Sequence, residues 1–134
     1  MIYIRRFRIL GSRSIPLPQR HILILTDLDG SLLDATTYSY DAAVDALSAI
    51  QTTGATLILV SSKTRSEMEP LRLRLHNHHP FIVENGGGLF IPKGSFPFRL
   101  EGATANGEYE VVAIGTPYAK LREALNAIRQ ELGC

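Results

Sequence analysis

The stretch His21-Ile-Leu-Ile-Leu-Thr26, followed at once by Asp27-Leu-Asp-Gly-Ser-Leu-Leu-Asp34, decides the fold of this chain. A continuous apolar run of this length is typical of a strand buried on both faces of a parallel sheet. Two aspartates two residues apart at the tip of such a strand are costly unless they serve a site. Gly30 allows a sharp departure from strand geometry, which can turn both carboxylates towards one pocket.

The same alternation of apolar strand and helical stretch continues along the chain. Helical spacing predicts helices over 41–53, with Gly54 as the stop, and over 66–75; apolar runs predict strands over 56–60 and 81–83, and residues 89–91 pair back after the turn at 86–88. This order predicts an α/β fold, a parallel sheet with right-handed crossovers and flanking helices. In such sheets reactive residues lie beyond the carboxyl ends of the strands.

The second half of the sequence contains a candidate domain boundary. Residues 93–108 are loop-like and rich in Gly, Ser, Pro and Asn, and a strand over 109–114 follows. Thr116 is expected to cap a helix with Pro117 at its first position. One face of that helix is apolar and contains Leu121, Leu125, Ile128 and Leu132. We therefore divide the chain into a leader (1–20), a core (21–100) and a further unit (101–134).

A second polar loop, Ser61-Ser-Lys-Thr-Arg65, directly follows the second buried strand. Its hydroxyls, Lys63 and Arg65 would form an anion pocket opposite the aspartates, beside a helix N-terminus. Alternatively the loop is an ordinary helix cap, and the two cations pair with Glu67 or Glu69. The histidines at 76, 78 and 79 have no acidic or cysteine partner nearby in sequence, so we expect a solvated loop there rather than a metal site.

Composition excludes several classes of protein. The only cysteine is Cys134, so an intrachain disulfide scaffold is excluded, and no apolar run reaches the roughly 20 residues that a membrane span needs. We expect a cytoplasmic protein with no membrane partner.

The net charge of +1 hides an uneven distribution. Five arginines precede the first acidic residue, Asp27, and leave nine basic against thirteen acidic groups in the remainder. This basic leader could be a targeting peptide or a nucleic-acid contact, or it could be a poorly ordered extension or the result of a wrongly chosen start codon. We favour an extension or start-site error, because Pro16 and Pro18 break any long amphipathic helix. Nothing in the acidic body resembles a base-reading element, so no nucleic-acid partner is expected.

Together these motifs resemble the haloacid dehalogenase (HAD) superfamily of phosphohydrolases, and within it a subfamily of sugar-phosphate phosphatases. The matching strings are Asp27-Leu-Asp-Gly-Ser-Leu32, Ser61-Ser-Lys-Thr-Arg-Ser-Glu67, Pro80-Phe-Ile-Val-Glu-Asn-Gly86, Phe90-Ile-Pro92 and Gly115-Thr-Pro-Tyr118. The resemblance implies a HAD-like Rossmannoid core over 21–100 and the beginning of a cap domain over 101–134.

The resemblance also implies a mechanism. Asp27 would be the nucleophile that forms an aspartyl-phosphate, and Asp29 the acid and base. Mg²⁺ would bind the Asp27 carboxylate and the Asp29 backbone carbonyl. The hydroxyl of Ser61 or Ser62 would hold a phosphoryl oxygen, and one residue of register decides which. The substrate would be a small sugar phosphate.

The sequence departs from the family pattern in two ways. Ser31 stands where threonine is usual, which is a mild change. More seriously, the third-motif lysine and the acidic fourth motif are missing, and no aspartate follows Asp45. Family members are roughly twice as long, so the chain is expected to be a truncated core with the start of a cap. The alternative function is therefore a catalytically incompetent fragment, or one part of a split enzyme whose second chain supplies the missing motifs.

Overall fold

The computed structural model describes residues 22–98 and 100–133. The predicted leader and Cys134 lie outside these ranges. The elements in chain order are β1 (Leu23–Asp27), η1 (Asp41–Ala43), α1 (Val44–Thr53), β2 (Thr56–Val60), α2 (Arg65–Arg74), β3 (Phe81–Val83), η2 (Glu84–Gly86), β4 (Gly88–Pro92), β5 (Thr104–Asn106), β6 (Tyr109–Ala113) and α3 (Tyr118–Leu132). None of the helices in the described ranges is long and apolar enough to cross a membrane, and the cytoplasmic location stays a prediction.

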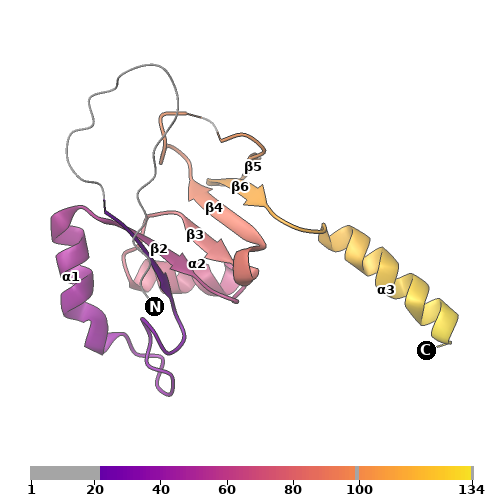
Figure 1. Cartoon of the computed structure of the whole chain (residues 1–134), viewed down its shortest axis with the longest axis horizontal. Helices are drawn as coiled ribbons and strands as arrows, with labels where there is room; N and C mark the ends of the chain where they lie inside the picture. Colours follow the sequence, from indigo (N-terminus) through magenta and orange to yellow (C-terminus); the bar gives the residue numbers. More distant parts are fainter. Residues whose placement is uncertain (1–21, 99, 134) are drawn as a thin grey trace.

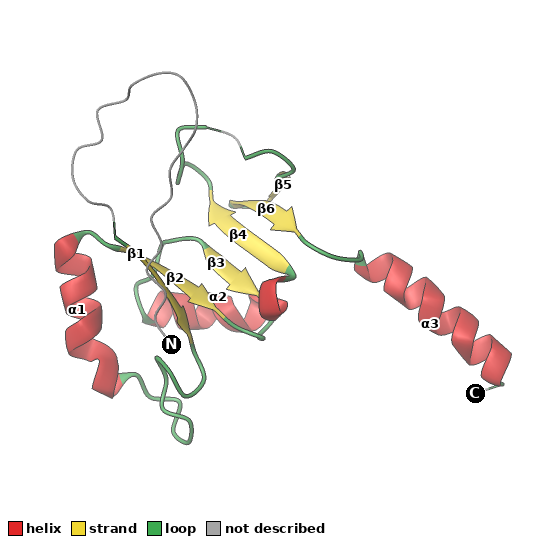
Figure 2. Ribbon diagram, in the orientation of Figure 1, coloured by secondary structure: helices red, strands yellow, loops and turns green. Residues whose placement is uncertain are grey.

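A six-stranded sheet in the order β1-β2-β3-β4-β6-β5 forms the centre of the molecule (Figure 2). β1, β2 and β3 are parallel, whereas β4, β6 and β5 are joined by antiparallel pairings. The predicted α/β class is confirmed, and the parallel arrangement holds for the first three strands. The antiparallel β3–β4 and β5–β6 pairs follow from their short connections, because strands joined by a tight turn return alongside each other.

The parallel register brings the ends of three strands together. Asp27 at the end of β1 pairs with Val60 at the end of β2, and Val60 pairs with Ile82 of β3. The backbone N–H of Ser61 continues the ladder by donating to the Ile82 carbonyl at 3.1 Å. The loops that follow β1 and β2 therefore leave the sheet side by side.

The core lies on one face of the sheet. Leu57 and Leu59 of β2 are buried on that face with Met68 of α2, whereas Ile58 and Val60 on the opposite face are only half-buried. The expectation that β1 and β2 are buried on both faces is therefore wrong for the described residues. Figure 1 shows α2 running behind the sheet and α1 beside the β1 edge.

An aromatic cluster extends the core under the antiparallel strands. The ring of Phe81 stacks on Phe90 with centroids 5.2 Å apart, and Tyr109 meets both rings edge-on. The guanidinium of Arg72, from α2, lies 4.0 Å from the Phe81 centroid and donates to the Tyr109 hydroxyl at 3.1 Å. These contacts hold the C-terminal part of α2 against β3 and β6.

The sheet continues across residue 100, where we place a boundary from the sequence. β6 pairs with β4 over five residues, and β5 forms within the stretch predicted to be only loop. The prediction of a loop throughout 93–108 is thus wrong at Thr104–Asn106. The division into units over 21–100 and 101–134 stays a prediction.

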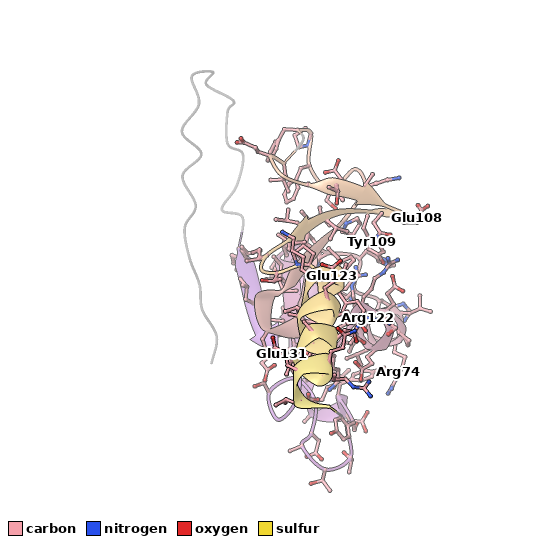
Figure 3. All side chains as sticks on the ribbon, turned by 90° about the vertical axis from the view of Figure 1, so that its right-hand side faces the viewer. Arg74, Glu108, Tyr109, Arg122, Glu123 and Glu131 are labelled. Carbon is pink, nitrogen blue, oxygen red and sulfur yellow. The ribbon has the colours of Figure 1, made fainter. Side chains whose placement is uncertain are left out.

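Helix α3 extends away from the sheet (Figure 1). It begins at Tyr118 with Pro117 as its N-cap and no side-chain cap, so the expected Thr116 cap is wrong by one residue. None of its residues is buried, and the predicted apolar face is exposed at Leu121, Leu125, Ile128 and Leu132. Figure 3 shows the helix nearest the viewer, with Arg122, Glu123 and Glu131 labelled.

Candidate active site

The loop after β1 is anchored by two buried leucines. Leu28 and Leu33 have almost no exposed surface, and the Leu33 N–H donates to the Leu28 carbonyl at 2.8 Å. Between them Gly30 has a φ of +71°, a left-handed conformation that favours glycine. Its N–H donates to the Leu33 carbonyl at 2.9 Å. This tight turn lets Asp27 and Asp29 remain exposed while their neighbours are buried.

Asp34 stabilises the second part of the same loop. Its Oδ1 accepts hydrogen bonds from the backbone N–H of Thr37 at 2.8 Å, from the backbone N–H of Thr36 at 3.0 Å and from the Thr37 hydroxyl. Hydrogen bonds to the charged form, the one from the Thr37 N–H above all, lower the pKa of Asp34 below its usual value. The ionised carboxylate therefore holds residues 34–37 in a fixed turn.

Asp27 and Asp29 have different surroundings. The Lys63 ammonium binds both carboxylate oxygens of Asp29, at 2.8 and 2.6 Å. Neither an ion pair nor a hydrogen bond to the Asp27 carboxylate occurs among the residues that the structure describes. The arrangement thus presents one open carboxylate beside one that is paired with a cation.

The loop after β2 places two serines differently. Ser61 is buried, and its hydroxyl oxygen accepts the Lys63 backbone N–H at 3.2 Å. Its carbonyl accepts the N–H of Asn85 at 3.1 Å, while Ser62 is exposed. Asn85 belongs to the string over residues 80–86 that matches the family pattern, and this hydrogen bond connects η2 to the Ser61 loop.

Lys63 is the residue that joins the two loops. The hydrogen bond to Asp29 raises the pKa of Lys63 above its ordinary value, against a smaller opposing effect of desolvation. The Lys63 ammonium also lies 5.6 Å from the centroid of the Tyr38 ring. Tyr38 was missed by sequence reasoning, because its nearness to Lys63 depends on the conformation of a turn that residue types do not specify.

The structure places Arg65 away from the aspartate pair. Its Nε donates to Glu69 at 2.9 Å, and its guanidinium lies over the rings of Phe90 and Tyr109. The Arg65–Glu69 ion pair is one of the alternatives that the sequence left open. Anion binding by Arg65 stays a prediction, and this ion pair would have to open for it.

Thr64 begins α2 with a capping box. The Thr64 backbone N–H and hydroxyl both donate to Glu67 Oε2, at 2.8 and 2.7 Å. The hydroxyl hydrogen bond, followed by the backbone one, lowers the pKa of Glu67. This cap fixes the first turn of α2 and so the end of the loop that contains Lys63.

The histidine cluster contributes to the structure at a different place. Nδ1 of His79 accepts the Leu57 N–H at 3.1 Å, and desolvation lowers the pKa of this imidazole. His78 borders a hollow of about 670 Å³ between α2 and the β4 and β6 strands, which Arg72 and Tyr109 also line. None of the predicted site residues lines that hollow, so it is separate from the aspartate pair.

Few side chains near the aspartates could act as metal ligands. Over residues 22–98 and 100–133, no group of three or more His, Cys, Asp or Glu side chains is arranged to hold a metal ion. Asp27 and Asp29 are the two acidic residues at the end of β1 that could contribute oxygen ligands. The combination of an open carboxylate, a cation and hydroxyl groups at the ends of parallel strands is suited to binding a phosphate ester.

Comparison with known proteins identifies the class to which this fold and site belong. Residues 24–94 match the family of haloacid dehalogenase-like hydrolases, and the chain belongs to that family. A crystal structure of a hypothetical protein from Geobacillus kaustophilus HTA426 superposes with a TM-score of 0.60 at 17% identity, over 85% of this chain and 38% of that one. This structural likeness confirms the fold.

The sequence relatives are more specific. The chain is 47% identical over 114 residues to a glucosyl-3-phosphoglycerate/mannosyl-3-phosphoglycerate phosphatase of Methanococcoides burtonii, a match over 85% of this chain and 42% of that protein. It is 37% identical over 111 residues to the mannosyl-3-phosphoglycerate phosphatase of Pyrococcus furiosus, over 83% of this chain and 45% of the relative. The resemblance of the sequence motifs to a subfamily of sugar-phosphate phosphatases is confirmed, and these relatives identify that subfamily as the mannosyl-3-phosphoglycerate phosphatases. The chain spans less than half the length of these curated relatives.

Proposed function

We propose that this chain contains the phosphoryl-transfer site of a phosphomonoesterase that acts on a sugar phosphate, with Asp27 as nucleophile. The observation that carries the proposal is the pairing pattern at the end of β1. Asp27 is exposed and has no partner for its carboxylate in the described part of the chain, so its lone pairs are open to attack an electrophile. The names of the relatives support glucosyl- or mannosyl-3-phosphoglycerate as the substrate.

The proposed reaction has two steps. A carboxylate oxygen of Asp27 attacks phosphorus, the bond from phosphorus to the sugar oxygen breaks, and Asp29 donates a proton to that leaving oxygen. Water then attacks the aspartyl-phosphate, Asp29 takes the proton from this water, and inorganic phosphate leaves with Asp27 regenerated. In the structure Lys63 binds Asp29 as a carboxylate, so this ion pair must open when Asp29 takes up the proton that it donates. The released Lys63 ammonium can then attract the anionic substrate.

Both serines remain in the proposal as ligands of a phosphoryl oxygen. Ser61 directly follows Val60, which faces Asp27 across the β1–β2 ladder, and its hydroxyl is oriented by the Lys63 N–H. Ser62 is one residue farther along and is exposed. Single alanine variants at the two positions separate these roles.

The donor chemistry of the site fits Mg²⁺. This ion takes oxygen ligands, uses one or two protein groups and fills its other positions with water and substrate phosphate. By resemblance to the family, the residues that would hold the ion are Asp27 through its carboxylate and Asp29 through its backbone carbonyl. Lys63 binds the Asp29 carboxylate in the structure, which is compatible with this assignment. Bound there, Mg²⁺ would offset the negative charges of Asp27 and the phosphoryl group.

The test is release of inorganic phosphate from mannosyl- and glucosyl-3-phosphoglycerate by the purified chain with Mg²⁺. We expect Asp27→Asn to reduce turnover to background and EDTA to do the same. Asp41→Asn, which changes another exposed carboxylate near the site loop, is the matched control and retains activity. Undiminished turnover in Asp27→Asn would remove this residue from the mechanism.

The small number of possible metal ligands supports a second candidate function, in which the chain is not an active phosphatase by itself. Over residues 22–98 and 100–133 no three His, Cys, Asp or Glu side chains are grouped as metal ligands, and no Gly-Asp motif occurs after Asp45 in the sequence. The chain would then be catalytically incompetent alone, or would act with a second chain that supplies further ligands. Turnover of about 1–1000 per second favours the first candidate, and turnover near background favours the second.

A further inference from the structure

Tyr38 adopts a backbone conformation that is unusual for its residue type. Its φ is +54°, in the left-handed region that a bulky aromatic residue rarely occupies. The surrounding turn imposes this conformation: the Tyr38 N–H donates to the Asp34 carbonyl at 3.0 Å, and the Asp34 N–H donates to the Ser39 carbonyl at 2.8 Å. The Asp34 carboxylate fixes the intervening residues from inside the turn. The loop is therefore built to hold Tyr38 in one place.

That place is beside the Lys63 ammonium. The centroid of the Tyr38 ring is 5.6 Å from Lys63 Nζ, within the range of a cation–π interaction. The ring is not packed into the core, since 54% of the residue surface is exposed. Burial of apolar area therefore does not explain why the loop holds the ring here, and its contact with the ammonium is a specific one.

The ion pair that Lys63 makes needs such support. Lys63 and Asp29 have side chains that are 23% and 39% exposed. Exposed ion pairs contribute little by themselves, because fixing two long side chains costs conformational entropy and water screens their charges. A third group that restricts the ammonium raises the fraction of time that the pair is formed.

We propose that Tyr38 is a positioning residue whose ring holds the Lys63 ammonium on the Asp29 carboxylate. The positioning depends only on these three side chains. Its consequence for catalysis rests on the proposed function: in the substrate-free site the fixed cation offsets the charge of Asp29 beside the open carboxylate of Asp27, where an anionic substrate must approach, and the ion pair opens when Asp29 takes up its proton.

Competitive acetylation of lysine tests the positioning without requiring turnover. The whole chain has three lysines, and Lys93 and Lys120 are exposed, so they are internal references for Lys63. The folded chain is treated briefly with an acetylating N-hydroxysuccinimide ester, and the modified peptides are quantified by mass spectrometry. We expect Lys63 to react more slowly than both references, and Asp29→Asn to abolish this protection.

Two substitutions of Tyr38 separate the ring from the turn. Tyr38→Asn removes the ring but suits the left-handed backbone, and Tyr38→Phe keeps the ring and removes the hydroxyl. We expect the Asn variant to raise acetylation of Lys63 relative to Lys93 by about two- to fivefold, the strength of an exposed cation–π contact. The Phe variant is expected to match the wild-type chain.

A spectroscopic signature covers the case in which a variant disturbs the fold. The ε-methylene protons of Lys63 should be shifted upfield by the ring current in wild type and Tyr38→Phe, and not in Tyr38→Asn. Unchanged acetylation in the Asn variant, or no ring-current shift in wild type, would overturn the proposal whatever the phosphatase assay shows. Conversely, a lack of phosphatase activity would contradict the proposed function but not the positioning by Tyr38, because an inactive chain can still protect Lys63 from acetylation.

Discussion

Ser61 and Ser62 are neighbours in the chain, yet the structure separates what their side chains do. The Ser61 hydroxyl is buried and accepts the Lys63 backbone N–H, whereas the Ser62 side chain is exposed. The sequence cannot distinguish them, because both follow the same strand and carry the same group. The difference comes from the direction in which the backbone leaves β2.

The two serines therefore differ in their predicted effect on stability. Ser61→Ala leaves the Lys63 N–H without its acceptor, and we expect it to lower the free energy of unfolding by about 1 kcal/mol. Ser62→Ala is expected to change it by less than about 0.5 kcal/mol, as is usual for exposed positions. Urea denaturation followed by circular dichroism measures both. Equal losses in the two variants would show that the Ser61 hydrogen bond does not stabilise the loop.

His79 makes the stability of the chain depend on pH. Its Nδ1 accepts the Leu57 N–H, which requires the neutral imidazole, and desolvation lowers its pKa below the ordinary 6.5. Because the unfolded chain binds this proton more readily, the stabilisation is present above about pH 6.5 and is lost as the pH falls through the lowered pKa of the folded state.

We therefore expect the melting temperature to fall between about pH 7 and pH 5.5, and His79→Gln to flatten this dependence. Glutamine can still accept a hydrogen bond but does not titrate. His76→Asn is the control, since His76 is exposed and its backbone φ of +50° is tolerated by asparagine. An identical pH profile in wild type and His79→Gln would assign the dependence to other groups.

Among the elements, α1 shows which boundaries a sequence can predict. Gly54 ends the helix in the left-handed conformation, with a φ of +67°, and its N–H donates to the Gln51 carbonyl. The stop was predictable because glycine is the residue that adopts this conformation without strain. The start of α3 was not predictable to the residue, because the sequence suits either Thr116 as N-cap with Pro117 at the first helical position, or Pro117 itself as N-cap, which is what the structure shows.

Gly54 gives a direct test of this boundary. A Cβ at residue 54 would meet no atom within 4 Å, so only the backbone conformation opposes substitution. We expect Gly54→Ala to lower the free energy of unfolding by about 1–2 kcal/mol and Gly54→Asn to cost less. Thermal unfolding of the three chains provides the comparison. A neutral alanine substitution would mean that α1 can end in another way.

The residue types predicted the positions of most strands, but not β5 or the contact between Tyr38 and Lys63. The strands at 56–60 and 81–83 lie at the predicted positions, since apolar runs between turn residues leave few alternatives. β5 was missed because Thr104-Ala-Asn106 has no apolar alternation, and it forms by pairing with β6. The nearness of Asp29 and Lys63 followed from parallel strand ends, whereas the Tyr38 contact depends on a tertiary turn conformation.

At the scale of the whole molecule, stability is concentrated in the sheet and α2. Leu59 is completely buried among residues of both, whereas 60% of Leu125 on α3 is exposed. We expect Leu59→Ala to cost about 2–5 kcal/mol in the free energy of unfolding. Leu125→Ala is expected to change it by less than about 0.5 kcal/mol. Urea denaturation distinguishes them, and a large loss in Leu125→Ala would show that α3 packs against another surface.

The isolation of α3 has a consequence for proteolysis. A protease cuts a segment only when local unfolding exposes it, and a single helix of about 15 residues is marginally stable without tertiary contacts. Trypsin should therefore cleave after Lys120 and Arg122 well before it cleaves after Arg72, which is buried under the aromatic rings. Brief digestion is expected to leave a resistant product that retains the sheet, the aspartate pair and α2, trimmed at the start of the protruding helix.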